Sequence, residues 1–257
     1  MMTEAPVRSL PLPGPVDVAT SSLFLDFDGT LIALEEDPHA VHVDTELAEL
    51  FGHLIERFEG RVAIVTGRSL EGMSGLMGPI AERFAMSGSH GAELRCNGII
   101  VNPDRPAALE AAAIRLGEFA DRHPGVILEI KSFGVGLHFR RAPDRSADAI
   151  ALVQAVADDL GLAYQSGSMM AEARVGGSNK GTAVTRLMSQ APMAGTTPIF
   201  LGDDDTDEPA LAATAALGGV AVAVGLRPSA SAQFRLPDTA AVRRWLAVIA
   251  GLEERVT

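Results

Sequence analysis

Two aspartates, Asp26 and Asp28, lie one residue apart where an apolar run ends, in the stretch LFLDFDGTL of residues 23–31. Aspartate side chains often bond to their own backbone in turns, so the pair could simply stabilise the Gly-Thr turn that follows. Alternatively, the two carboxylates hold a cation and carry out chemistry with it. The stretch alone favours the turn, and the choice depends on what else the chain brings to the same place.

Two further polar motifs follow apolar runs, namely VTGR at residues 65–68 and GDDDTDE at residues 202–208. Ligands of open parallel sheets bind beyond the carboxyl ends of the strands, where these motifs are expected to meet. So many carboxylates would repel one another there, and Mg²⁺ with carboxylate and phosphate ligands relieves the repulsion. Lys180 follows the glycine-containing stretch VGGSN and supplies a point charge for a phosphoryl oxygen, while Thr66 offers a hydroxyl. The combination indicates a metal-dependent phosphate site.

Apolar runs alternate with amphipathic stretches at both ends of the chain, which predicts a parallel sheet covered on both faces. The expected helices are 45–58, 69–77, 180–188, 208–215 and 239–252, and the expected strands are 23–26, 61–65, 84–87, 198–201 and 219–224. A hairpin turning at Asn97-Gly98 is expected after the third of these strands, because that pair tolerates positive φ.

Between NPDRP and VGGSN the pattern changes to a helix and two strands, repeated once. This predicts an inserted α+β module. The expected organisation is a disordered lead at 1–20, an α/β core at 21–103 and 178–257, and the module at 104–177.

Alternation within the module predicts one polar face on its sheet. Residues expected on that face are Glu129, Lys131, His138, Arg140 and Glu172, opposite an apolar face with Leu128 and Ile130 under the helices. Mixed carboxylates and cations suit sugar hydroxyls, because they supply both acceptors and donors. A half-exposed antiparallel sheet with ordinary cross-strand ion pairs explains the pattern equally well.

The formal net charge of −12 argues against nucleic acid or an anionic membrane as a partner. Cys96 is the only cysteine, which excludes an internal disulfide and suits a reducing compartment. With no apolar stretch of about 20 residues and no signal-peptide pattern at the start, we expect a cytoplasmic protein that does not enter a membrane.

The motifs LDFDGTL, VTGR, SNKG and GDDDTDE resemble those of the haloacid dehalogenase-like phosphatases. More narrowly, SGSHGAELR, LEIKSFGVGLHFR and GSMMAEARVGGSNKG resemble trehalose-6-phosphate phosphatases. The resemblance implies a Rossmann-like α/β core of the haloacid dehalogenase type with an inserted C2-type α+β cap domain. Phe139 and Val175 depart from the usual Tyr and Pro, which affects fine specificity rather than the reaction.

By this resemblance, Asp26 is the nucleophile, Asp28 the general acid and base, and Thr66 and Lys180 hold the transferring phosphoryl group. Asp26, the backbone carbonyl of Asp28 and Asp203 would ligate Mg²⁺. The substrate-binding residues implied are Gly67, Arg68, His90, Glu129, Lys131, His138, Glu172, Asp204 and Asp207. For His90 a structural hydrogen-bonding role is equally open, and for Arg140 an ion pair.

The expected activity is Mg²⁺-dependent hydrolysis of trehalose 6-phosphate through an aspartyl-phosphate. The alternatives are the same chemistry on sucrose phosphate or mannosyl-3-phosphoglycerate, and a catalytically silent sugar-phosphate sensor. We expect a monomer with a small-molecule partner and a functional link to a trehalose-6-phosphate synthase.

Overall fold

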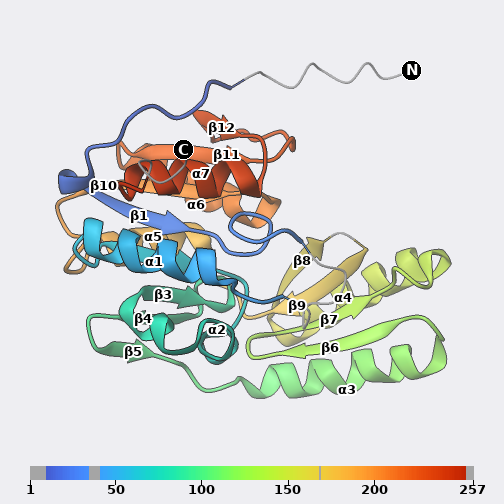
Figure 1. Ribbon diagram of the computed structural model, residues 1–257. Helices are drawn as coiled ribbons and strands as arrows, with labels where there is room; N and C mark the ends of the chain where they lie inside the picture. The colour runs from blue at the N-terminus through green and yellow to red at the C-terminus, as the bar shows by residue number, and fades with distance from the viewer. Residues whose placement is uncertain (1–9, 35–40, 168, 253–257) are drawn as a thin grey trace. The chain divides into compact units, whose positions relative to one another are not determined.

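The computed structural model describes residues 10–34, 41–167 and 169–252, which form two compact units (Figure 1). The inserted unit is Asn102–Ser178, and the core unit comprises the chain before Asn102 and from Asn179 onward. The limits predicted from the sequence, 104 and 177, differ from these by two residues and one residue.

The core unit contains an eight-stranded sheet of order β12-β11-β10-β1-β2-β3-β4-β5. Its strands are β1 Ser21–Leu25, β2 Val62–Val65, β3 Ala85–Gly88, β4 Glu93–Cys96, β5 Ile99–Val101, β10 Thr197–Gly202, β11 Val220–Val224 and β12 Phe234–Leu236. All neighbours from β12 to β3 are parallel, while β4 and β5 form the antiparallel hairpin predicted at Asn97-Gly98. The predicted α/β fold is confirmed.

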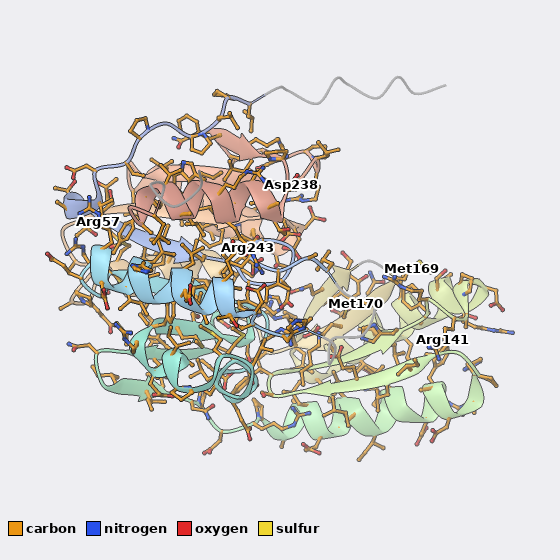
Figure 2. The ribbon with its side chains drawn as sticks, viewed as in Figure 1. Arg57, Arg141, Met169, Met170, Asp238 and Arg243 are labelled. Atoms are coloured by element: carbon orange, nitrogen blue, oxygen red, sulfur yellow. The ribbon has the colours of Figure 1, made fainter. Side chains whose placement is uncertain are left out.

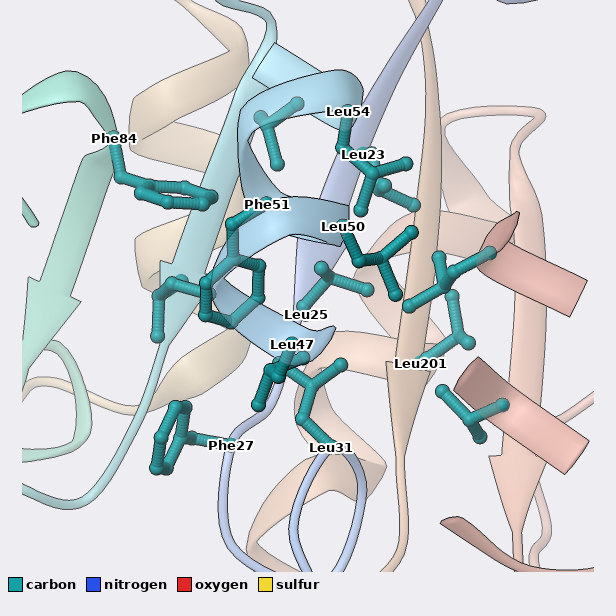
Figure 3. Close-up of a cluster of buried hydrophobic side chains, with 14 of the residues drawn as sticks. Leu23, Leu25, Phe27, Leu31, Leu47, Leu50, Phe51, Leu54, Phe84 and Leu201 are labelled. Carbon is teal, nitrogen blue, oxygen red and sulfur yellow. The ribbon is translucent and has the colours of Figure 1, made fainter. Parts of the chain in front are cut away.

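Helices cover both faces of this sheet, as the apolar strands require. Leu23 and Leu25 of β1 face a buried cluster on one side, whereas Phe24 belongs to a cluster on the other. The first cluster includes α1 Thr45–Arg57, α2 Leu70–Met77 and α7 Thr239–Ile249, and the second includes α5 Lys180–Met188 and α6 Glu208–Ala216. Figure 3 shows Phe27 and Leu31 continuing the first cluster beyond the end of β1.

Asp44 caps the N-terminus of α1 and, through Arg243, ties the helix to the loop that follows β1. Its Oδ1 accepts from the Leu47 N–H at 2.7 Å, and its Oδ2 accepts from Arg243 Nη1 at 2.6 Å. Arg243, labelled in Figure 2, also donates from Nε to the Leu31 carbonyl at 2.8 Å. Although partial burial opposes the effect, Arg243 and the Leu47 N–H lower the pKa of Asp44.

We expect Asp44→Ala to lower the free energy of unfolding by about 1–2 kcal/mol, since it removes both the helix cap and the ion pair. Asp44→Asn is the matched control, because it keeps a good cap and loses only the charge. The lowered pKa means that the charge stabilises the fold above the ordinary Asp value of about 3.9 and stops doing so as pH falls through the folded value. Urea denaturation should therefore show that wild type and D44N converge in acid. Equal stability of wild type and D44A at pH 7 would contradict the cap.

The inserted unit has an antiparallel sheet of order β6-β7-β9-β8 and two helices. Its elements are α3 Ala107–Arg122, β6 Ile127–Lys131, β7 Gly134–His138, α4 Ser146–Leu160, β8 Ala163–Gly167 and β9 Met170–Arg174. Leu137 packs into a buried cluster with both helices, and Leu128 packs against that cluster. Two expectations were wrong. Ile130 is 61% exposed near the end of the edge strand β6, and Arg140 lies in a turn after β7 rather than on the sheet.

Residues 10–20 also differ from the expected disordered lead. The Arg235 N–H of β12 donates to the Pro11 carbonyl at 2.9 Å, and Val18–Thr20 forms a 3-10 helix. Arg61 donates to the Val18 and Ala19 carbonyls, which ties this helix to the start of β2. Residues 1–9 lie outside the described part of the chain. Among the described helices, none combines the length and the apolar character needed to cross a bilayer.

Candidate active site

The three polar strand ends predicted to meet do lie on adjacent strands. β1 pairs with β10 on one side and β2 on the other, with Leu25 opposite both Leu201 and Ile64. The Asp26 N–H continues the ladder by donating to the Leu201 carbonyl at 3.0 Å. Phe27 is fully buried in the core (Figure 3), which fixes the backbone between the two aspartates. The polar motifs are therefore brought together at the carboxyl edge of the sheet.

Lys180 joins two of these motifs through a buried ion-pair network. Its Nζ donates to Asp26 Oδ1 at 2.7 Å and to Asp207 Oδ1 at 2.8 Å, and all three side chains are at most 4% exposed. Although burial opposes it, Asp207 and Asp26 raise the pKa of Lys180, so the ammonium stays charged. Lys180 begins α5, whose start is fixed by a reciprocal cap between Asn179 and Thr182.

The carboxylates of Asp26, Asp203 and Asp207 offer oxygens that all lie within 4.8 Å of one another. Burial raises the pKa of Asp26 to about 7, and although Lys180 opposes this shift, Asp203 adds to it. Burial and the charges of Asp207 and Asp204 likewise raise the pKa of Asp203 to about 6. The single ammonium of Lys180 does not neutralise the charge of these three carboxylates. Because the carboxylates offer only oxygen ligands, the cluster fits a hard divalent cation such as Mg²⁺.

Asp207 and Asp204 occupy different environments, although sequence reasoning grouped them together. Asp207 Oδ2 accepts the backbone N–H groups of Asp203 and Asp204 at 3.0 and 3.1 Å, so this residue shapes the loop from inside. Asp204 is exposed, and its Oδ1 accepts from the N–H and hydroxyl of Thr206 at 2.8 and 2.6 Å. Asp207 therefore belongs to the buried cluster and Asp204 to its rim.

Asp28 lies outside the carboxylate cluster and pairs with Arg68. Arg68 donates from Nε and Nη2 to the two oxygens of Asp28, each at 2.7 Å. Such a two-pronged pair fixes the plane of the carboxylate as well as its position. Both side chains remain partly exposed, at 25% for Arg68 and 30% for Asp28. The two predicted aspartates thus have different partners.

Beside this pair lie Thr66, Gly67 and His90, which contact one another. The Thr66 carbonyl accepts the His90 N–H at 3.0 Å, and the Thr66 hydroxyl accepts the Arg68 N–H at 3.1 Å. A Cβ on Gly67 would stand 2.6 Å from the His90 ring, so the close packing of that ring depends on glycine. The structure thus places His90, which only the resemblance had suggested, next to the Thr66-Gly67 turn.

The polar face of the inserted unit carries a connected ion-pair network. Lys131 Nζ lies 2.6 Å from Glu172 and 3.5 Å from Glu129, and His138 Nε2 lies 2.7 Å from Glu129. Glu172 is only 3% exposed, and a Cβ on Gly134 of the facing strand would overlap its carboxylate. His138 lowers the pKa of Glu129 by a hydrogen bond, and Lys131 adds to this effect against partial burial. Ion pairing and a binding face for hydroxyls are both compatible with this arrangement.

Sequence reasoning missed two residues within its own first motif. The Thr30 hydroxyl donates to Asp203 Oδ1 at 3.2 Å. Gly29 has φ +84°, and a Cβ there would overlap the Asp203 carboxylate. The Gly-Thr turn was visible in the sequence, but its contact with a loop more than 170 residues away depends on the strand order.

We expect Gly29→Ala to reduce activity by about a hundredfold, because a misplacement of about 1 Å at a reacting centre has that effect. Gly60→Ala is the matched control, since Gly60 has φ +78° and no atom within 4 Å of the place that a Cβ would take, and therefore shares only the backbone strain. Steady-state kinetics should separate the two variants at equal folded content. Equal activity of the two variants would show that the contact with Asp203 is unimportant.

Comparison with known proteins agrees with this arrangement. Residues 24–238 match the family model described as trehalose-phosphatase. The chain is 34% identical over 231 residues to the trehalose-6-phosphate phosphatase of Escherichia coli, which covers 88% of this chain and 85% of that protein. A solved structure titled as a trehalose-6-phosphate phosphatase related protein superposes with a TM-score of 0.76 at 29% identity, covering 91% of this chain and 99% of the other.

A more distant solved structure, a phosphatase of the haloalkanoate superfamily from Bacteroides thetaiotaomicron, shares the fold. Its TM-score is 0.59 at 17% identity, with 94% of this chain and 98% of the other covered. This likeness supports the haloacid dehalogenase type of core that the motifs had predicted. The matched family model and the Escherichia coli relative show that the chain belongs to the trehalose-phosphatase family.

Proposed function

We propose that this protein is a Mg²⁺-dependent phosphatase that hydrolyses trehalose 6-phosphate to trehalose and phosphate. The observation that carries the proposal is the buried network of Asp26, Lys180 and Asp207 beside Asp203, at the carboxyl edge of a sheet in a chain of this family. Burying a lysine and two carboxylates costs desolvation free energy, so stability alone does not explain the network. Binding of a phosphate group does explain it.

In the first step, an oxygen of Asp26 attacks phosphorus as the bond from phosphorus to the sugar oxygen breaks. Asp28 gives its proton to the departing sugar oxygen, so the leaving group departs as an alcohol. Lys180 holds one oxygen of Asp26, which orients the carboxylate and places a positive charge beside the transferring group. Thr66 contributes its hydroxyl from the end of β2.

In the second step, water attacks the phosphorus of the aspartyl-phosphate and gives a proton to Asp28, which restores both aspartates and releases phosphate. The pair with Arg68 fits the ionised carboxylate, which is the form of Asp28 that accepts this proton. Arg68 therefore orients the base in addition to any contact with the substrate.

Asp26, Asp203 and the backbone carbonyl of Asp28 would hold Mg²⁺. When bound, the ion offsets the repulsion between an anionic nucleophile and a phosphate dianion. Thr30 and Asp207 keep Asp203 in place, through its side chain and its backbone respectively. Burial raises the pKa of Asp26, and a bound cation would favour its ionised form, which is the form that attacks phosphorus.

Recognition of the sugar is assigned to the polar face of the inserted unit. Glu129, Lys131, His138 and Glu172 supply acceptors and donors for hydroxyl groups, and Gly67, Arg68, His90, Asp204 and Asp207 lie in or beside the core site. We further propose that the protein acts as a cytoplasmic monomer and is linked functionally to a trehalose-6-phosphate synthase.

A phosphate-release assay across related substrates tests the proposal. The panel contains trehalose 6-phosphate, sucrose phosphate, mannosyl-3-phosphoglycerate and glucose 6-phosphate. We expect kcat/KM to be highest for trehalose 6-phosphate, and preference for another member would reassign the substrate. Binding without turnover of any member would identify a sensor.

A further inference from the structure

Arg227 lies in the loop after β11, outside every motif that the sequence singled out. β11 runs parallel to β10 (Figure 1), so this loop meets the acidic loop, which we define as residues 203–208 after β10. Arg227 is 30% exposed at its side chain. It is therefore held against the protein rather than extended into solvent.

The guanidinium of Arg227 contacts four of the six residues of the acidic loop. Nε donates to the Asp203 carbonyl at 3.1 Å, and Nη2 donates to the Asp204 carbonyl at 2.6 Å and to Glu208 Oε1 at 3.0 Å. Nη1 pairs with the carboxylate of Asp205. Glu208 also accepts the Ala230 N–H at 3.2 Å, which ties the loop of Arg227 back to the start of α6.

Arg227 and Asp207 hold the same two residues from opposite sides. Asp207 Oδ2 accepts the N–H groups of Asp203 and Asp204, while Arg227 donates to the carbonyls of those residues. All four polar backbone groups of this pair are thereby fixed. The side chain that they position is Asp203, whose carboxylate belongs to the group close to Asp26.

We propose that Arg227 is a positioning residue for the divalent-cation site, acting through the backbone of Asp203. The inference rests on the proposed function in one respect, namely that the carboxylates of Asp26 and Asp203 hold Mg²⁺. It adds a residue from outside the motifs, whose part is to hold the acidic loop in the shape that the ion requires.

Charge and geometry predict opposite effects of losing Arg227, which makes the inference testable. A positive charge near the site repels a divalent cation. If charge alone mattered, removing Arg227 would therefore tighten Mg²⁺ binding. Loss of the backbone contacts would instead let Asp203 move and weaken binding. The carboxylates of Asp205 and Glu208 offset much of the charge of Arg227, so we expect geometry to dominate.

The test measures Mg²⁺ binding by isothermal titration calorimetry on the full chain without substrate. We expect Arg227→Gln to raise the dissociation constant for Mg²⁺ about tenfold or more, the usual effect of losing a residue that orients a metal ligand. Arg227→Lys should also bind Mg²⁺ more weakly than wild type, because a single ammonium cannot contact both carbonyls and Glu208 at once. In phosphate release, kcat at saturating Mg²⁺ should return to within a few-fold of wild type.

Arg244→Gln serves as the matched control, because it removes an exposed arginine of α7. It should bind Mg²⁺ like wild type. Far-UV circular dichroism checks folding, and if R227Q does not fold, the same titration on R227K decides.

Unchanged or tighter Mg²⁺ binding by folded R227Q or R227K would overturn the inference. Absence of measurable Mg²⁺ binding by wild type would overturn both this inference and the proposed cofactor. If the variants lose affinity for Mg²⁺ but wild type hydrolyses no member of the substrate panel, the positioning role stands and only the proposed function fails.

Discussion

Replacing Asp26 by asparagine should abolish phosphate release, with a loss of at least about a thousandfold in kcat, since removal of a nucleophile typically has an effect of that size or more. The amide cannot attack phosphorus to form the acyl phosphate, whatever its position. The fold should survive, because Lys180 keeps its contact of 2.8 Å with Asp207 and the asparagine side chain is nearly the same size as the aspartate it replaces. Steady-state kinetics with trehalose 6-phosphate gives the measurement.

Binding of the substrate separates a chemical role of Asp26 from a structural one. D26N should retain affinity for trehalose 6-phosphate in calorimetry with Mg²⁺, because most contacts with the sugar are assigned to other residues. Asp144→Asn is the matched control, since its carboxylate is 72% exposed outside the proposed site and the variant should stay fully active. Substantial turnover by D26N would rule out Asp26 as the nucleophile.

Replacing Lys180 by methionine should reduce both stability and activity. The change leaves Asp26 and Asp207 buried without their shared cation, and removing one member of a buried ion pair typically costs about 3–5 kcal/mol in the free energy of unfolding. Activity should fall by at least about a hundredfold, because the charge beside the transferring phosphoryl group is lost. Urea denaturation and phosphate release provide the two measurements.

A double variant distinguishes these two effects. Lys180→Met with Asp207→Asn removes one of the two carboxylates left uncompensated, so it should recover part of the lost stability. It should remain inactive, because neither substitution restores a cation. Recovery of activity together with stability would show that Lys180 acts only on the fold. Unchanged stability in K180M would contradict the electrostatic account of the network.

Much of the core site was predictable from the sequence because it depends on regular features. Apolar runs identified β1, β2 and β10, and the rule that ligands bind at the carboxyl edge of parallel strands placed Asp26, Thr66 and Asp203 together. Alternation likewise placed Glu129, Lys131, His138 and Glu172 on one face, where the ion pairs between them now appear.

The remainder depends on contacts that no local pattern encodes. Arg227 lies two residues after Gly225 in an ordinary loop, and its role is visible only because β11 lies beside β10. The pairing of Asp28 with Arg68 and the different environments of Asp204 and Asp207 also depend on loop shape. Arg140 was misplaced because alternation was extended past the end of β7 at His138.

Trapping of the covalent intermediate tests the central claim most directly. Wild-type protein turning over trehalose 6-phosphate with Mg²⁺ is quenched and treated with borohydride, which reduces an aspartyl-phosphate to homoserine, and the peptides are mapped by mass spectrometry. We expect homoserine at position 26, dependent on substrate and absent from D26N. Homoserine at Asp28 or Asp203 instead, or its absence from every peptide during active hydrolysis, would contradict the proposed mechanism.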